Sequence, residues 1–177
     1  MPARSKARKR ALDILFEAEL RGIPVLDLLD ERVAMASPPV SAYAADLVRG
    51  VVAHSTRIDE LIAAHAEGWT LGRMPAVDRN VLRIGVYELF WAPDVPDGVA
   101  ISEAVALAQD LSTDNSASFV NGVLARIKAD KPTLSLDPEA SAFAGEEEGE
   151  DDDEDDADPY ADDDEQPAAT REPHPHP

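Results

Sequence analysis

The sequence predicts an all-α fold for the body of the chain, which we place at residues 1–136. Apolar residues recur there at spacings of three and four, the period of amphipathic helices, and prolines separate the periodic segments. No run rich in β-forming residues offers a strand for pairing. A body of this length supports one hydrophobic core and is too short for two ordinary domains. We therefore expect one compact bundle of about six to seven helices.

The first two helices lie before residue 37. Leu12 and Leu15 belong to an apolar stripe at helical spacing, and Gly22 supplies a stop, which predicts a first helix of about four turns. Pro24 suits the start of a second helix, and the linker SPPVS from Ser37 ends it.

The middle of the chain contains the most apolar segment. Residues 43–65 keep the helical period through Gly50, which predicts either one long helix or two stacked ones. The stretch 67–74 breaks the pattern, and Pro75 suits the first turn of the next helix. That helix is apolar on nearly every side from 77 to 91, which indicates a central, buried position.

Two further helices are predicted at residues 99–111 and 119–127. The second contains a local conflict, because Asn121-Gly122 between apolar runs is a strong hairpin signal. Helical spacing on both sides favours a helix in which Gly122 allows close packing.

Charge divides the chain into two parts. The formal net charge is -20, yet residues 137–177 hold eighteen acidic residues against one basic residue and account for -17 of it. The body carries only -3. Fifteen of the twenty residues from 146 to 165 are acidic, and they repel one another while offering little apolar surface to offset ordering entropy. We expect a disordered, low-complexity acidic tail over 137–177.

Several classes of function and location are disfavoured by the sequence. The absence of cysteine excludes disulfides and thiolate metal sites. We find no Gly-rich phosphate loop, nucleophile motif or metal triad, so we expect no enzyme activity, cofactor or metal. Asp13, Glu17 and Glu19 interrupt the apolar stretch that a signal peptide would need, and no segment is long enough to span a bilayer. These features predict a cytoplasmic protein.

A basic cluster opens the chain, formed by Arg4, Lys6, Arg8, Lys9 and Arg10. Arg4 and Arg8 extend the direction of the apolar stripe, where burial would be costly without partners. We therefore expect the start of the helix to project from the body or to fray until it meets an anion. Such an arm could bind phosphates, and the alternative is a terminus that only aids solubility.

Four segments resemble transcription antitermination factors of the NusB family. They are RSKARKRALDILFEAEL from Arg4, RNVLRIGVYEL from Arg79, VAISEAVALAQ from Val99 and FVNGVLARI from Phe119, in matching order and spacing. The resemblance runs to about Ile127. It implies a NusB-like helical bundle without catalytic activity that binds the boxA RNA of ribosomal RNA operons together with ribosomal protein NusE. It also implies other Nus factors and RNA polymerase as partners, in either a monomer or a homodimer.

The resemblance also implies RNA contacts at particular residues: Phe16, Asp78, Arg83 and Phe119, with both phenylalanines on one RNA-facing edge. From the residues alone, Phe16 falls at the edge of the apolar stripe, where its ring could stack on a base or pack in the core. Arg83 follows Arg79 at helical spacing in a basic stripe suited to phosphates and bases. The alternative is that Arg83 and Glu88 are satisfied by partners inside the bundle.

Asn115 and Ser118 depart from the family pattern, which often has charged residues at these positions. The resemblance therefore assigns no polar RNA contacts to Asn115 and Ser118 at the RNA-facing edge.

Two other functions are alternatives to antitermination. A similar helical domain precedes the catalytic domain of some ribosomal RNA cytosine methyltransferases, but that function needs a downstream α/β domain, and only the acidic tail follows here. The other alternative is a helical protein-interaction module without RNA binding.

Overall fold

A computed structural model describes residues 2–134 and shows an all-α fold, as the sequence predicts. The seven helices are α1 (Ala3–Arg21), α2 (Val25–Met35), α3 (Ala42–Ala53), α4 (Ser55–His65), α5 (Ala76–Trp91), α6 (Asp97–Leu111) and α7 (Ser116–Asp130). Two short 3-10 helices, η1 (Leu71–Arg73) and η2 (Lys131–Thr133), complete the described part. The domain boundary predicted at 136 and the predicted disorder of the tail lie outside these residues.

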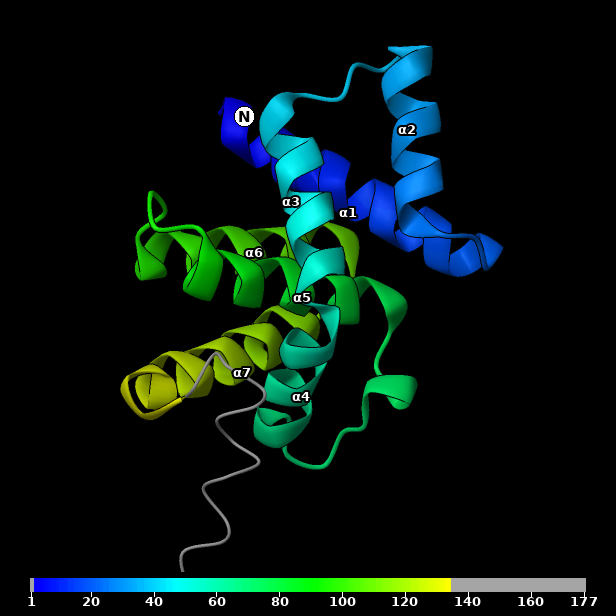
Figure 1. Cartoon of the computed structure of the whole chain (residues 1–177). Coiled ribbons are helices and arrows are strands. Elements are labelled where there is room, and N and C mark those ends of the chain that lie inside the picture. The colour runs from blue at the N-terminus through cyan, green and yellow to red at the C-terminus, as the bar shows by residue number, and fades with distance from the viewer. Residues whose placement is uncertain (1, 135–177) are drawn as a thin grey trace, which may run out of the picture.

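Helix α5 is the centre of the bundle, and α1, α3, α4, α6 and α7 all pack against it (Figure 1). Val81, Leu82, Ile84 and Val86 are buried on several sides of the helix. A helix that is apolar all round has no face suited to water, so it is stable only inside the bundle. The predicted central helix is thereby confirmed.

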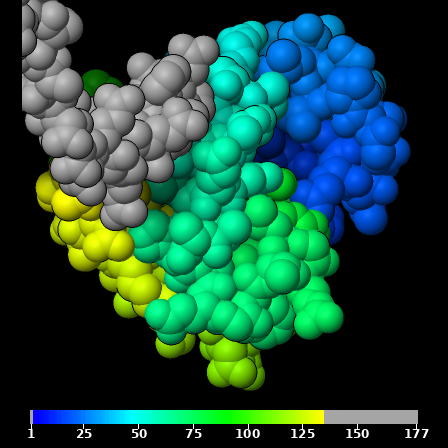
Figure 2. All heavy atoms as spheres, turned by 60° about the horizontal axis from the view of Figure 1, so that its bottom comes forward, coloured from blue at the N-terminus to red at the C-terminus, as the bar shows by residue number. Residues whose placement is uncertain are grey.

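Helices α1 and α2 form one end of the molecule, well away from α7 (Figure 2). Gly22 ends α1 in the left-handed conformation, with a φ of 63° that glycine adopts without a steric penalty. Helix α2 packs on α1 and α3 and buries Leu28 and Leu29 (Figure 1). The predicted stop at Gly22 is therefore confirmed.

The segment from 42 to 65 folds as two stacked helices, α3 and α4, that meet at His54 (Figure 1). Gly50 lies against the ring of Tyr87 on α5, and a β-carbon at this position would overlap that ring. Because Gly50 has no side chain, α3 and α5 can approach closely at this position, and α3 continues through it without a break.

Asn121-Gly122 lies within α7, so the predicted helix is confirmed and the hairpin is excluded. The close packing predicted at Gly122 is wrong, however, because a β-carbon there would meet only a guanidinium nitrogen of Arg126 at 3.8 Å. The close approach occurs at Gly85 instead, where an added β-carbon would lie 2.8 Å from Leu124. A small residue is thus needed on α5 rather than on α7.

Candidate nucleic-acid interface

The basic cluster at the start of the chain does not form one flexible arm. Helix α1 already begins at Ala3, and its turns distribute the basic side chains around the helix. Arg8 is only 2% exposed, so the expectation that it projects into solvent or frays is wrong. The physical reason is that the bundle supplies the partners that burial of a charge requires.

The guanidinium of Arg8 joins four helices, because its partners lie on three helices other than α1. The Nε of Arg8 donates to both carboxylate oxygens of Glu88 on α5, at 3.0 and 2.9 Å. Its Nη1 lies 3.3 Å from Glu103 on α6, and its Nη2 donates to the hydroxyl of Tyr43 on α3 at 3.4 Å. Burial alone would lower the Arg8 pKa, but the hydrogen bond and charge of Glu88 raise it. We call these four residues the Arg8 cluster.

Tyr43 completes the cluster by donating its own hydroxyl hydrogen to Glu88. Burial, followed by this hydrogen bond and the charge of Glu88, raises the pKa of Tyr43. The alternative in which Glu88 has partners inside the bundle is thus confirmed. Arg8 therefore supports the fold and offers RNA no surface in this conformation.

Arg4 is exposed but engaged. Its Nη2 lies 2.6 Å from Asp94, and its guanidinium carbon lies 5.0 Å from the centre of the Tyr43 ring. Arg10 donates to the carbonyl of Pro38 at 3.4 Å, while its Nε is buried without a partner among the described residues. Both side chains are therefore partly committed to the protein itself.

The outward face of α1 carries the remaining basic residues. Residues spaced alternately by three and four lie on one face of a helix. They form what we call the outer ridge: Lys6, Lys9, Asp13, Phe16 and Leu20. Its N-terminal end is basic, although Lys9 is paired with Asp13 at 3.3 Å. Its other end is apolar, with Phe16 partly exposed and Leu20 75% exposed.

A second candidate surface lies where α5 and α7 begin. We call it the aromatic pocket, a hollow of 350 Å³ lined by Trp69, Pro75, Asp78, Thr113, Asn115, Ser116 and Phe119. The rings of Trp69 and Phe119 are 6.0 Å apart and tilted by 56°. Trp69 remains 49% exposed, so aromatic surface is open to a ligand.

Asp78 supplies the charged group of the aromatic pocket. Its side chain is buried, and its Oδ2 accepts a hydrogen bond from the Ser116 hydroxyl at 2.8 Å. Its Oδ1 is also buried and has no hydrogen-bond partner among the described residues. A buried carboxylate oxygen without a donor is costly, and a ligand N–H group would relieve that cost.

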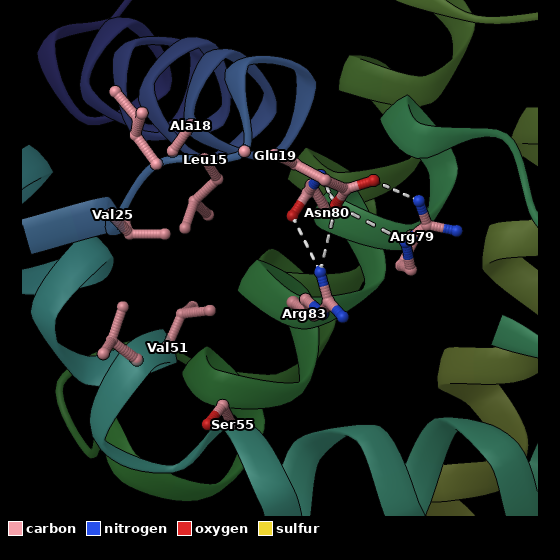
Figure 3. A pocket seen from close by; sticks show the side chains of 12 residues that line it. Leu15, Ala18, Glu19, Val25, Val51, Ser55, Arg79, Asn80 and Arg83 are labelled. Atoms are coloured by element: carbon pink, nitrogen blue, oxygen red, sulfur yellow. Dashed lines mark hydrogen bonds and ion pairs between the residues drawn. The ribbon is translucent and has the colours of Figure 1, made fainter. Parts of the chain in front are cut away.

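Arg83 lies in a third region, which we call the Glu19 cluster. Glu19 at the end of α1 accepts hydrogen bonds from Arg79 and Asn80 and forms an ion pair with Arg83 at 3.3 Å (Figure 3). Arg83 also donates twice to Asp59 on α4, both times at 2.8 Å. Burial alone would lower the Arg83 pKa, but Asp59 and Glu19 raise it. The alternative in which partners inside the bundle satisfy Arg83 is thus confirmed, while contact of Arg83 with RNA stays a prediction.

The Glu19 cluster closes one side of a cleft of 460 Å³ between α1, α2, α3 and α5. Apolar side chains including Leu15, Val25 and Val51 line the rest of the cleft (Figure 3). The charges at its polar side are already paired with each other. This cleft is therefore less suited to phosphates than the outer ridge.

The Glu19 cluster leads to a prediction about acid stability. Burial alone would raise the Glu19 pKa, but hydrogen bonds from Arg79 and Asn80 lower it below the ordinary value of 4.5. The stability that ionised Glu19 contributes is therefore present above pH 4.5 and is lost as the pH falls through the lowered pKa of Glu19 in the folded protein. We expect Glu19→Gln to lower the free energy of unfolding by about 1–2 kcal/mol at pH 7, a value between those of exposed and buried ion pairs. The difference from the unsubstituted protein should shrink towards pH 3.

Denaturant unfolding at several pH values measures this difference. Glu67→Gln is the matched control, because Glu67 is exposed and its only described ion pair is with Arg126 at 3.9 Å. A Glu19→Gln difference that stays constant from pH 7 to pH 3 would contradict the prediction.

Sequence reasoning missed Trp69. It lies in the segment between α4 and α5 where the helical period fails, so the pattern gave it no role. A signal was nevertheless available, since binding residues are disproportionately found on loops. Phe16 and Phe119 occupy different surfaces, the outer ridge and the aromatic pocket, and their common RNA-facing edge stays a prediction.

Residues 2–134 show neither a membrane-spanning helix nor a metal site. No helix in this range has the length and apolarity to cross a bilayer. The same range contains no group of His, Asp or Glu side chains arranged to hold a metal ion.

Comparison with known proteins gives a consistent result. Residues 5–129 match a family model described as the NusB family. A protein from Thermobifida fusca called transcription antitermination protein NusB is 58% identical over 134 residues, which is 76% of this chain and 94% of that protein. A protein of the same name from Saccharopolyspora erythraea is 61% identical over 129 residues, covering 72% and 87% of the two chains.

Solved structures agree with the sequence match. NusB from T. maritima superposes with a TM-score of 0.65 and 35% identity, covering 73% of this chain and 92% of that one. A crystal structure of antitermination factors NusB and NusE in complex with dsRNA gives 0.63 and 31%, covering 71% and 96%. The chain therefore belongs to the NusB family.

Proposed function

We propose that this protein is a transcription antitermination factor that binds the boxA RNA of ribosomal RNA operons together with ribosomal protein NusE. It acts in the cytoplasm by binding rather than by catalysis. The observation that carries the proposal is the likeness to a NusB that was solved with NusE and RNA. The bound pair would join other Nus factors and RNA polymerase and support full-length ribosomal RNA transcription.

The outer ridge is the proposed path of the RNA backbone. Lys6 and Lys9 are its basic groups, and Phe16 is an aromatic platform two turns further along the same face. Lysines attract phosphates at any sequence, and an exposed ring stacks on an unpaired base. Arg4 and Arg10 stay predicted RNA contacts, although their side chains already contact Asp94 and the Pro38 carbonyl. Arg8 is left out because its guanidinium is buried.

The aromatic pocket is the proposed base-reading part of the interface. Its volume of 350 Å³ falls within the usual range for small-molecule sites, so it can hold one nucleobase. Trp69 and Phe119 supply rings, and the free Oδ1 of Asp78 can accept an amino or imino hydrogen of the base. Arg83 is a supporting residue, because two carboxylates already hold it.

A salt titration tests the role of the outer ridge. If Lys6 and Lys9 contact phosphates of a single strand, Lys6→Ala/Lys9→Ala should reduce the slope of log affinity against log salt by about 1.4. Lys128→Ala is the control, since Lys128 is exposed on α7 rather than on the ridge. The measurement uses labelled boxA and scrambled RNA, each with and without NusE. An unchanged slope would assign the two lysines a role in solubility alone.

Leucine substitutions test the two aromatic platforms. Phe16→Leu and Phe119→Leu keep most of the apolar volume, yet each should lose part of the roughly 1–3 kcal/mol expected for one stacked base. Melting temperatures of the same variants separate stacking from packing. Loss of stability with unchanged boxA affinity would make both phenylalanines core residues and would leave the lysine result intact.

A further inference from the structure

A small hollow lies where the start of α3 meets the end of α5, apart from the outer ridge and the aromatic pocket. Its volume is 210 Å³, and its lining includes three aromatic rings, Tyr43, Tyr87 and Trp91. Two carboxylates, Asp46 and Asp94, complete the polar part of the lining. The hollow therefore combines ring faces with negative charge.

The rings are held in place by neighbouring side chains. Trp91 stacks on His54 with ring centres 4.2 Å apart and planes 11° apart. Tyr87 lies 6.2 Å from Trp91 at an angle of 17°, and Gly50 leaves the space that its ring occupies. A ligand would thus meet walls that are already formed, which lowers the entropy cost of binding.

The carboxylates make the hollow attractive to a cation. Asp46 is 68% exposed, and its ion pair in the described region is with Arg49 at the long distance of 4.0 Å. Asp94 is 61% exposed and pairs with Arg4. Burial, together with the charges of Asp46, Glu88 and Asp94, raises the pKa of Tyr87, as expected in a negative environment.

Arg4 shows within this chain how such a surface holds a guanidinium. It lies over the Tyr43 ring and pairs with Asp94 at the rim of the hollow. Arginine suits this environment because its planar group stacks on aromatic faces while its N–H groups donate to carboxylates. Asp46, Tyr87 and Trp91 offer the same combination to a second guanidinium.

We propose that this hollow, which we call the arginine pocket, binds an arginine side chain presented by a partner protein. Its volume lies below the usual 300–1,000 Å³ of small-molecule sites, so the end of one side chain fits it better than a nucleotide does. Like charge also opposes RNA phosphates beside Asp46 and Asp94. The proposal uses neither the outer ridge nor the aromatic pocket, and it shares with the predicted RNA contacts only Arg4, at the rim of the hollow.

Nuclear magnetic resonance on the full chain tests the arginine pocket directly. The chain has two tryptophans, so ¹⁵N labelling gives two indole N–H signals, which Trp69→Phe assigns. The probe is the capped tripeptide Gly-Arg-Gly, with Gly-Lys-Gly and the neutral Gly-citrulline-Gly as comparisons. We expect Gly-Arg-Gly to shift the Trp91 signal saturably while the Trp69 signal stays fixed as an internal control.

Substitution of the carboxylate gives the second part of the test. Asp46→Asn should weaken Gly-Arg-Gly binding about two- to fivefold, as expected for loss of one exposed charge pair. Asp110→Asn on α6 is the exposed control and should leave binding unchanged. Equal binding of the citrulline or lysine peptide, or no effect of Asp46→Asn, would overturn the proposal. A Trp91 shift caused by dilution of the protein alone would also overturn it, because the occupant would then be a second copy.

Discussion

Replacing Arg8 with Ala is expected to destabilise the protein by about 3–5 kcal/mol, the usual cost of removing one partner from a buried ion pair. The guanidinium joins Glu88, Glu103 and Tyr43, so its loss leaves the carboxylate of Glu88 buried without its cation. Such a loss should lower the melting temperature by roughly 10–20 °C for a domain of this size. Calorimetry and denaturant unfolding measure both quantities.

Lys9→Ala is the matched control on the same helix. Among residues 2–134, Lys9 pairs only with Asp13, whose side chain is 45% exposed, so its removal should change stability by less than about 0.5 kcal/mol. The double variant Arg8→Met/Glu88→Leu should recover much of the loss, since it removes both buried charges together. Equal stability of Arg8→Ala and Lys9→Ala would place the Arg8 side chain in solvent, as the sequence alone suggested.

The fold was largely predictable because burial follows the helical period. The central position of α5 follows from its all-round apolarity, and Gly22 marks the end of α1 by its left-handed backbone. Such signals are local, and each can be recognised within one segment. The choice between one and two helices at 42–65 was not local, since it depends on how α3 and α4 pack against α5.

The candidate site was less predictable because its contacts join residues far apart in sequence. Arg8 and Glu88 are separated by 80 positions, and nothing near Arg8 indicates that a carboxylate will meet it. The sequence could state only that burial of Arg8 needs partners. The sequence allowed the alternative that partners inside the bundle satisfy Arg83. It could not name those partners, Asp59 and Glu19, because they lie on two other helices.

Residues of the basic cluster, although adjacent in sequence, differ in solvent exposure. Five basic side chains within seven positions face different directions on one helix, so Lys6 is exposed while Arg8 is buried. The aromatic pocket gives the opposite case, since Trp69, Asp78 and Phe119 are distant in sequence and adjacent in space. Density of charge along the chain is therefore a weaker guide to an interface than the helical face on which each charge lies.

The second large effect is expected at Gly50, where an alanine β-carbon would overlap the Tyr87 ring. Alanine favours a helix over glycine by about 1 kcal/mol, so the substitution would stabilise an isolated α3. In the bundle the ring must move, which gives up its stacking against Trp91 and its packing over α3. Overpacking costs about 1–3 kcal/mol, and we expect Gly50→Ala to be destabilising on balance.

A double-mutant cycle distinguishes this contact from a general intolerance of α3. In a Tyr87→Ala background the obstructing ring is gone, so Gly50→Ala should stabilise the protein by up to about 1 kcal/mol. The sign of one substitution would thus reverse with the identity of a residue on another helix. Chemical denaturation of the four proteins measures the coupling. Stabilisation by Gly50→Ala in both backgrounds would mean that the Tyr87 ring does not lie across α3, whereas destabilisation in both would place the obstruction elsewhere in the bundle.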